Sequence, residues 1–212
     1  MKVALLLYPD VEPIDLATIG VISMGKRVIP ELSYVTVAAT TAPVRLANGL
    51  RVLPDLALNE AVDTAVDVLV VPGGPGWQLA AKDAALLAFV QKLPESCLKV
   101  SVCTGGMILA AAGCLDGRSA TTKREVIEPE ESPLALMAAR YPAIKVHHAL
   151  LVDQGQVLTG GGVSLCIDAM LHLIERRFGT DKAGAIARIL EYSAARSANQ
   201  SRLPVVVETT AD

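Results

Sequence analysis

Short runs of apolar residues alternate along the chain with longer stretches whose apolar positions recur at helical spacing. A short, continuous apolar run is typical of a strand buried on both faces, and the longer spacing is typical of an amphipathic helix. The runs predict strands at residues 3–7, 32–39, 67–71 and 98–102. The spacing predicts helices at residues 14–28, 84–93, 104–112, 164–178 and 180–191, and one more that begins within 128–133 and ends near residue 140.

Turn residues complete this pattern at two places. An Asn-Gly pair between alternating segments predicts a hairpin at residues 44–52, because this pair favours a tight hairpin turn. A Gln-Gly pair likewise predicts an antiparallel pair formed by residues 149–153 and 156–159. Since the other strands are separated by helices, we expect an α/β fold: one domain with a doubly wound, mostly parallel sheet sandwiched by helices.

The chain divides into a predicted α/β domain at residues 1–192 and a C-terminal tail at residues 193–212. The tail mixes small and polar residues before three valines at positions 205–207. We expect a loosely attached terminus, with the alternative that the valines add an edge strand or an interface.

Composition narrows the function classes. Apolar residues make up 52% of the chain and aromatic residues 3%, so Ala, Val, Leu and Ile must build the core. The net charge of -3 gives no electrostatic reason to expect nucleic acid or a membrane as a partner. No apolar stretch approaches the roughly 18 residues of a membrane span. Without a visible secretory signal, and with four cysteines that lack metal-type spacing, we expect a cytoplasmic protein with reduced thiols, no metal and no cofactor.

Cys103 is the candidate for chemistry because it lies in the turn between a predicted strand and a predicted helix. Reactive groups collect at the carboxyl ends of strands in open α/β sheets, and the start of a helix is expected to lower the pKa of a thiol. Gly105 and Gly106 allow close backbone approach, as in a nucleophile elbow. The alternative is a buried core thiol. The other cysteines are less well placed for catalysis: Cys97, Cys114 and Cys166.

Four short segments occur in a characteristic order along the chain. They are LLLYPDVEPIDL at residues 5–16, VLVVPGG at 68–74, SVCTG at 101–105 and LTGGG at 158–162. Together they resemble the ThiJ/PfpI superfamily, over about residues 2–180. The resemblance implies a class I glutamine-amidotransferase-like, flavodoxin-like sandwich in which Cys103 is the reactive thiol.

Within that superfamily, Asp15 together with Cys103 and Thr104 looks closest to isocyanide hydratases. The resemblance implies that the Cys103 thiolate attacks the terminal carbon of an isocyanide and that water resolves the thioimidate to an N-substituted formamide. Asp15 would handle protons and position water, and Thr104 would assist through its hydroxyl. The backbone amides at Gly73, Gly74 and Thr104 would face developing charge. From the residues alone, a helix N-cap is the simpler interpretation of Asp15.

The substrate pocket expected around the thiol includes Trp77, Thr122 and Lys123. A rim or core position is the alternative for Trp77, which follows a Pro-Gly-Gly-Pro-Gly loop. Lys123 stands where related sequences often have His, so a Cys–His pair is not supported at this position. It could favour an anionic substrate, hold the thiolate by its charge, or be a solvated lysine. The histidines are expected to be structural: His147, His148 and His172.

Two other interpretations stay open. One is a glyoxalase-like enzyme or small-molecule hydrolase of the same superfamily that acts on another small electrophile. The other is a non-enzymatic module that senses a ligand or an oxidant through Cys103. In each case the partner is a small molecule, and the resemblance implies a homodimer.

Overall fold

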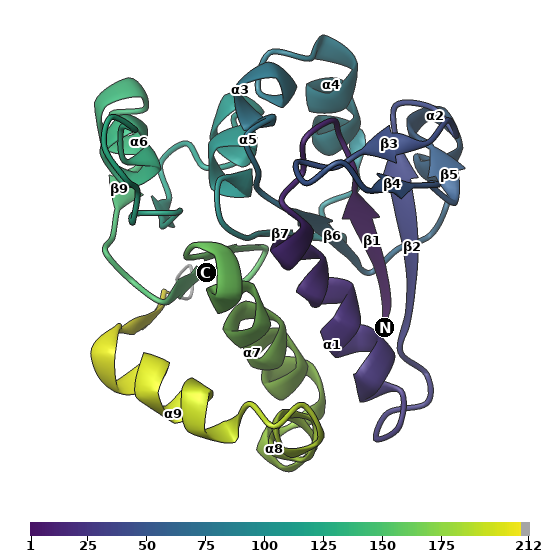
Figure 1. Cartoon of the computed structure of the whole chain (residues 1–212), viewed down its shortest axis with the longest axis vertical. Coiled ribbons are helices and arrows are strands. Elements are labelled where there is room, and N and C mark those ends of the chain that lie inside the picture. The colour runs from purple at the N-terminus through teal and green to yellow at the C-terminus, as the bar shows by residue number, and fades with distance from the viewer. Residues whose placement is uncertain (209–212) are drawn as a thin grey trace.

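Eight strands form one central sheet in the computed structural model of the chain, which describes residues 1–208 (Figure 1). Neighbouring strands are parallel except for one antiparallel pair, β10 with β11. The sheet order is β12 (Val205–Val207), β10 (Leu151–Asp153), β11 (Val157–Gly160), β7 (Leu98–Ser101), β6 (Val68–Val71), β1 (Lys2–Leu6), β2 (Ser33–Ala38) and β5 (Leu56–Ala57). The predicted fold class is confirmed.

Helices cover both faces of this sheet because its strands are apolar on both sides (Figure 1). In β1, Val3 and Leu5 pack into one core cluster, and Ala4 and Leu6 pack into the other. The first cluster includes residues of α1 (Ala17–Gly25), α7 (Cys166–Phe178) and α8 (Thr180–Ile189). The second includes residues of α2 (Leu58–Ala61), α3 (Trp77–Ala80), α4 (Ala84–Lys92), α5 (Gly105–Ala111) and α6 (Pro133–Arg140).

Two small sheets flank the central one. The predicted hairpin is confirmed as the antiparallel pair β3 (Val44–Arg45) and β4 (Arg51–Val52). The second small sheet, the parallel pair β8 (Ser119–Ala120) and β9 (Lys145–Val146), was not predicted, because two-residue strands leave no periodic pattern.

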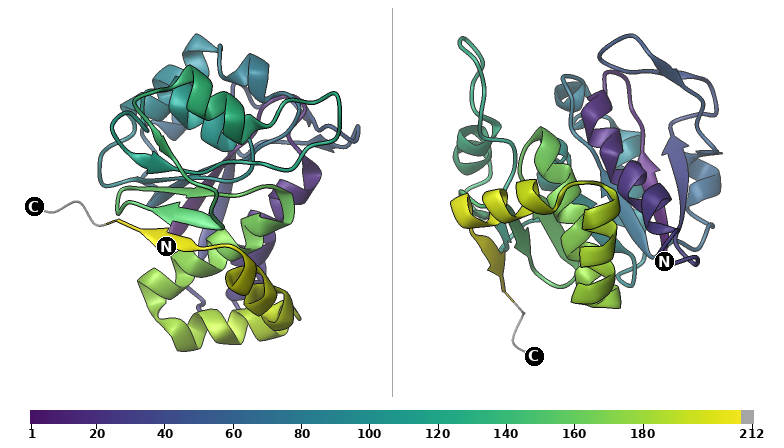
Figure 2. Two further views of the ribbon diagram at one scale, coloured as in Figure 1. Left: turned by 90° about the vertical axis from the view of Figure 1, so that its left-hand side faces the viewer. Right: turned by 60° about the horizontal axis from the view of Figure 1, so that its bottom comes forward.

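The segment after residue 192 is folded, so the expected loose attachment is wrong. It forms α9 (Ser193–Arg202) and then β12, which pairs with β10 at the edge of the sheet (Figure 2). The hydroxyl of Tyr192 donates to Asp168 Oδ2 (2.7 Å), and Asn199 Nδ2 donates to the same oxygen (2.9 Å). Asp168 lies on α7 and is only 2% exposed, so these bonds join the tail to the core. Residues 209–212 of the predicted tail lie outside the described residues.

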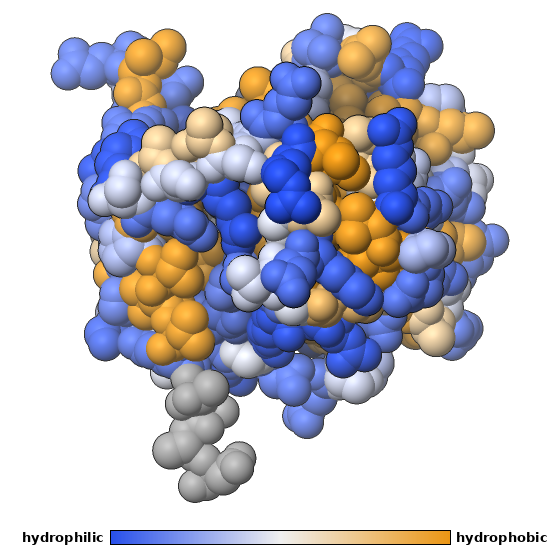
Figure 3. Space-filling model, turned by 90° about the horizontal axis from the view of Figure 1, so that it is seen from below, coloured by the Kyte–Doolittle hydropathy of each residue, from blue (hydrophilic) through white to orange (hydrophobic). Residues whose placement is uncertain are grey.

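The surface is mainly polar on the side where α8 and α9 lie. Figure 3 shows hydrophilic side chains there around separate apolar patches. No helix within residues 1–208 is long and apolar enough to cross a membrane.

The order of the strands creates a switch point beside β1. The chain leaves β1 for β2 on one side and returns on the other side as β6 and β7. Ligands of open α/β sheets bind at the carboxyl ends of strands where the order reverses in this way. The loops that follow β1, β6 and β7 therefore meet at the edge where a site is expected.

We predict that Tyr192→Phe lowers the free energy of unfolding by about 1.5 kcal/mol, because it leaves the buried Asp168 carboxylate with one donor fewer. Urea unfolding at constant pH measures the change. Tyr34→Phe is the matched control, since Tyr34 is 37% exposed, and it should change stability by less than about 0.5 kcal/mol. Equal stabilities for Tyr192→Phe and the wild type would show that the tail is not held by this bond.

Candidate active site

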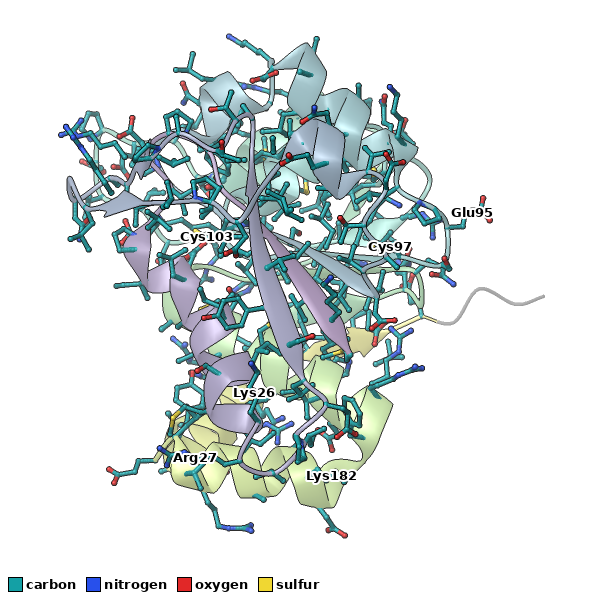
Figure 4. The ribbon with its side chains drawn as sticks, turned by 90° about the vertical axis from the view of Figure 1, so that its right-hand side faces the viewer. Lys26, Arg27, Glu95, Cys97, Cys103 and Lys182 are labelled. Atoms are coloured by element: carbon teal, nitrogen blue, oxygen red, sulfur yellow. The ribbon has the colours of Figure 1, made fainter. Side chains whose placement is uncertain are left out.

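Cys103 lies in a strained turn directly after β7. Its φ angle is 53°, in the left-handed region that few residues other than glycine adopt. Two hydrogen bonds hold the turn: the Cys103 N–H donates to the Gly161 carbonyl (2.9 Å), and Thr122 Oγ1 donates to the Cys103 carbonyl (2.7 Å). Figure 4 shows Cys103 far from Cys97, which precedes the other end of β7. The strand and its turn therefore present the Cys103 sulfur as a nucleophile elbow does.

The turns after β6 and β7 approach each other closely. Val71 and Ser101 are register partners, so the two strands end at the same level. A Cβ atom on Gly105 would lie 2.0 Å from the Val71 carbonyl oxygen, and a Cβ atom on Gly73 would lie 2.5 Å from the Thr104 nitrogen. Neither position has room for a side chain. The glycines are needed for this approach and place the Gly73 turn against the elbow.

Asp15 reaches the same place from a 3₁₀ turn, Pro13–Leu16, that follows β1. Its side chain is fully buried, and Oδ2 accepts the N–H of Gly73 (2.6 Å). The other oxygen, Oδ1, has no hydrogen-bond partner within residues 1–208. Burial raises the pKa of Asp15 to about 7, against the lowering effect of the Gly73 N–H, and the charge of Glu12 adds to the rise. The N-cap of this turn is Glu12, so Asp15 is not its cap.

Burial and, after it, the charge of Asp15 raise the pKa of the Cys103 thiol to about 12, which favours the protonated form at neutral pH. Hydrogen bonds from the amides of Val163 and Thr104 to the sulfur, and the charge of Lys123, oppose this rise. The amide of Thr104 at the helix start lowers this pKa as expected, but burial of a thiol that is only 2% exposed beside a carboxylate raises the pKa by more.

The glycine amides are already engaged by the protein. The Gly73 N–H donates to Asp15, and the Gly74 N–H donates to Thr104 Oγ1 (2.9 Å). The expectation that both amides face the charge on a substrate is therefore wrong. Thr104 uses its hydroxyl to hold the Gly74 turn, and Thr122 supports the elbow without lining the cavity.

A cavity of about 490 Å³ opens beside the sulfur. Of the residues predicted from the sequence, it is lined by Cys103, Thr104, Gly74, Trp77 and Lys123, whereas Gly73 and the buried Asp15 lie behind its wall. Trp77 is 8% exposed at the start of α3. The remaining lining residues are Glu12, Pro75, Gln78, Val126, Glu130, Glu131, Pro133, Leu136, Arg140 and Val163.

Two residues of the site were missed by the sequence analysis. The amide of Val163 faces the Cys103 sulfur, and Val163 has a φ angle of 49° although its side chain is β-branched. The hydroxyl of Tyr8 donates to the Pro72 carbonyl (2.8 Å) and ties the loop after β1 to the loop after β6. A backbone N–H is present whatever the side chain, so the residue type does not reveal it as a donor. The only signal in the sequence is the position of Val163 directly after the glycine run.

The remaining cysteines and histidines lie away from the cavity lining. Cys166 is fully buried, and its thiol donates to the Ile14 carbonyl (3.7 Å). His172 pairs with Asp153 (2.9 Å), and His147 bonds Ser119 (3.0 Å), which are contacts that support the fold. Within residues 1–208, no group of three or more His, Cys, Asp or Glu side chains is placed to hold a metal ion.

Comparisons with known proteins agree with this geometry. The model of the DJ-1/PfpI family matches residues 1–176. An isonitrile hydratase of Pseudomonas putida is 30% identical over 196 residues, which are 92% of this chain and 80% of that protein. A glutathione-independent glyoxalase of Caenorhabditis elegans is 25% identical, over 89% of this chain and 96% of that protein. The solved structure of a mutant DJ-1 superfamily protein from Salmonella typhimurium has a TM-score of 0.75 at 26% identity and matches over 90% of this chain and 98% of that chain.

We predict that Asp15 makes the protein less stable as the pH rises. Its pKa is about 7 in the fold against 3.8 for an ordinary Asp, so the folded state keeps the proton that the unfolded state releases, and stability falls between about pH 4 and about pH 7. Asp15→Asn cannot ionise, so it should remove this fall and stabilise the protein at pH 8 by up to about 4 kcal/mol. Urea unfolding over this pH range measures the effect.

The control for this series is Asp63→Asn, the same chemical change at an exposed position. It should leave the pH profile of stability as it is in the wild type. A profile for Asp15→Asn that runs parallel to that of the wild type would contradict the raised pKa of Asp15.

Proposed function

Since the chain belongs to the DJ-1/PfpI family, we propose that it is a cysteine-dependent enzyme that hydrates isocyanides to N-substituted formamides. Cys103 is the nucleophile, Asp15 is the general acid and base, and Thr104 positions the turn that faces them. The similarity to an isonitrile hydratase supports this choice of reaction.

One observation carries the proposal: the buried Asp15 carboxylate lies beside the Cys103 thiol, whose hydrogen bond lowers the pKa of Asp15. Oδ1 has no other hydrogen-bond partner within residues 1–208, and none of the three histidines lines the cavity. Asp15 is therefore the group that can exchange a proton with Cys103. A nucleophile whose own pKa is high needs such a base within reach.

In the first step, the ionised Asp15 carboxylate takes the thiol proton as the Cys103 sulfur bonds to the terminal carbon of the isocyanide. As this bond forms, one electron pair of the carbon–nitrogen triple bond moves to the nitrogen. The lone pair of the carbon then takes the proton from Asp15. The product is a thioimidate in which sulfur is bound to a CH=N group. The amides of Val163 and Thr104 stabilise the sulfur while it carries negative charge.

In the second step, Asp15 takes a proton from water as the water oxygen bonds to the thioimidate carbon, and the nitrogen becomes an N–H. The carbon–sulfur bond then breaks, the carbonyl of the formamide forms, and the proton returns to Cys103. The sum is one isocyanide and one water converted to one formamide, so no redox cofactor is needed. A carboxylate with a pKa near neutrality suits both directions of proton transfer.

The proposal also includes a compartment, a size of substrate and an oligomeric state. All four cysteines are free, which supports a reducing compartment such as the cytoplasm. The substrate is a small molecule, because the cavity of about 490 Å³ has room for little more. The homodimer stays a prediction, which gel filtration with light scattering tests.

We predict turnover of alkyl or aryl isocyanides to formamides by the wild type and a loss of at least about 10³-fold in kcat/KM for Cys103→Ala. The matched control is Cys97→Ala, which removes another buried thiol that precedes the other end of β7 and does not line the cavity. It should retain most of the activity, and formamide is measured by chromatography. Equal turnover by wild type and Cys103→Ala would reject the mechanism, and turnover of methylglyoxal instead of isocyanides would favour a glyoxalase, in line with the second relative.

We predict that kcat/KM for isocyanide hydration rises with pH and levels off above about 7, because Asp15 must be ionised to accept the thiol proton. Below this value the rate should fall about tenfold per pH unit. The profile is measured between about pH 5 and about pH 9. A rise that continues to the highest pH tested would mean that direct ionisation of Cys103, and not Asp15, limits the reaction.

A further inference from the structure

Lys123 presents an unpaired positive charge to the cavity that holds the Cys103 sulfur. The lysine has no carboxylate within 4.0 Å among residues 1–208. Its Nζ donates to the backbone carbonyl of Glu125, while the carboxylate of Glu125 pairs with Arg124. An ammonium group has three donors, so two remain for a ligand.

The protein makes room for the stem of this lysine. Gly162 has φ and ψ angles of -79° and 147°, an ordinary extended conformation that any residue adopts. A Cβ atom there would lie 2.9 Å from Lys123 Cγ. The backbone conformation therefore does not require glycine at position 162, but the methylene groups of Lys123 leave no space for a side chain there. Because Val163 is the next residue and its amide bonds the Cys103 sulfur, the stem is held beside the reacting atom.

The other charged residues that line the cavity are Glu12, Glu130, Glu131 and Arg140. Glu130, Glu131 and Arg140 are exposed, where water and salt screen their charge. The carboxylate of Glu12 accepts the N–H of Ile14 in its own turn (3.4 Å). Lys123 is half-buried and, unlike these residues, lowers the pKa of Cys103, so its charge is felt at the sulfur.

We propose that Lys123 makes this site specific for substrates that carry a carboxylate close to the reacting carbon. The inference rests on the proposed function, to which it adds a substrate class: isocyanides with a carboxylate one or two atoms from the isocyano nitrogen. Because Cys103 and Lys123 line the same cavity, the carboxylate of such a molecule can reach the lysine while the Cys103 sulfur bonds the terminal carbon. The two free donors of the ammonium group bind it there.

Alkylation of Cys103 tests the inference without using isocyanide chemistry. Iodoacetate and iodoacetamide both react by forming a carbon–sulfur bond and releasing iodide, but only iodoacetate carries a carboxylate next to the reacting carbon. The ratio of their rates at Cys103 is measured by peptide mass spectrometry in the wild type and in Lys123→Met, which keeps the stem and removes the charge. Any change in the pKa of Cys103 affects both reagents equally, so it cancels in the ratio.

We expect the ratio of iodoacetate to iodoacetamide rates to fall about tenfold in Lys123→Met. Lys182→Met is the matched control, because Lys182 is exposed on α8 far from Cys103 (Figure 4), and it should keep the ratio of the wild type. The half-buried Cys114 gives an internal reference for the two reagents. An unchanged ratio in Lys123→Met would overturn the inference.

A second measurement separates this inference from the proposed function. The ratio of kcat/KM for isocyanoacetate to that for its ethyl ester should fall by a similar factor in Lys123→Met. Turnover of both compounds with an unchanged ratio would leave the hydratase standing and reject the carboxylate preference. A changed alkylation ratio without turnover of any isocyanide would reject the hydratase and retain the anion-binding lysine.

Discussion

The close approach of the turns after β6 and β7 is the constraint on which the site depends. Gly105 lets the elbow rest against the Val71 carbonyl, and Gly73 lets its own turn rest against Thr104. That contact brings the Gly73 N–H to Asp15 and leaves the Cys103 sulfur beside the same carboxyl group. A single Cβ atom at either glycine would push these two turns apart. The pairing of β6 with β7 keeps the two strands level, so the sheet determines the geometry of the site.

Burial then determines which of the two groups, Asp15 or Cys103, ionises first. Both groups are almost fully buried, so a negative charge on either is costly, and the pKa values of Asp15 and Cys103 are both raised. The two groups cannot readily be ionised together, and Asp15, with a pKa of about 7, ionises before Cys103 as the pH rises. In the proposed mechanism the thiol gains nucleophilic character as its proton moves to Asp15. That mechanism couples proton transfer to bond formation and differs from one that uses a thiolate stabilised in advance by a helix.

Sequence pattern predicts the layers of the fold, because continuous apolar runs mark β1, β6 and β7. It also places Cys103 in the turn after a strand, but the pairing of Cys103 with Asp15 follows only from the resemblance to the ThiJ/PfpI superfamily, since the residues alone favour a helix N-cap for Asp15. The sequence does not show which partner each backbone N–H group of the site bonds. Whether the amide of Gly73 faces a ligand or a carboxylate depends on atoms far apart in the chain. The expectation of a loosely attached tail is wrong for a similar reason, because the attachment depends on a contact between two helices: Asn199 of α9 donates a hydrogen bond to Asp168 of α7.

Several unfavourable features gather at the edge of the sheet where Cys103 lies. Cys103 and Val163 both have positive φ, and Asp15 keeps a buried oxygen without a partner. Each such feature costs on the order of 1–3 kcal/mol, and each persists only where the surroundings leave no alternative. In the proposed mechanism these features serve the reaction: the strained Val163 brings its amide to the sulfur, and the under-bonded Asp15 accepts a proton. Relaxing either would then stabilise the fold and remove a donor or an acceptor that the proposed reaction uses. The instability of this edge would then be a consequence of that chemistry.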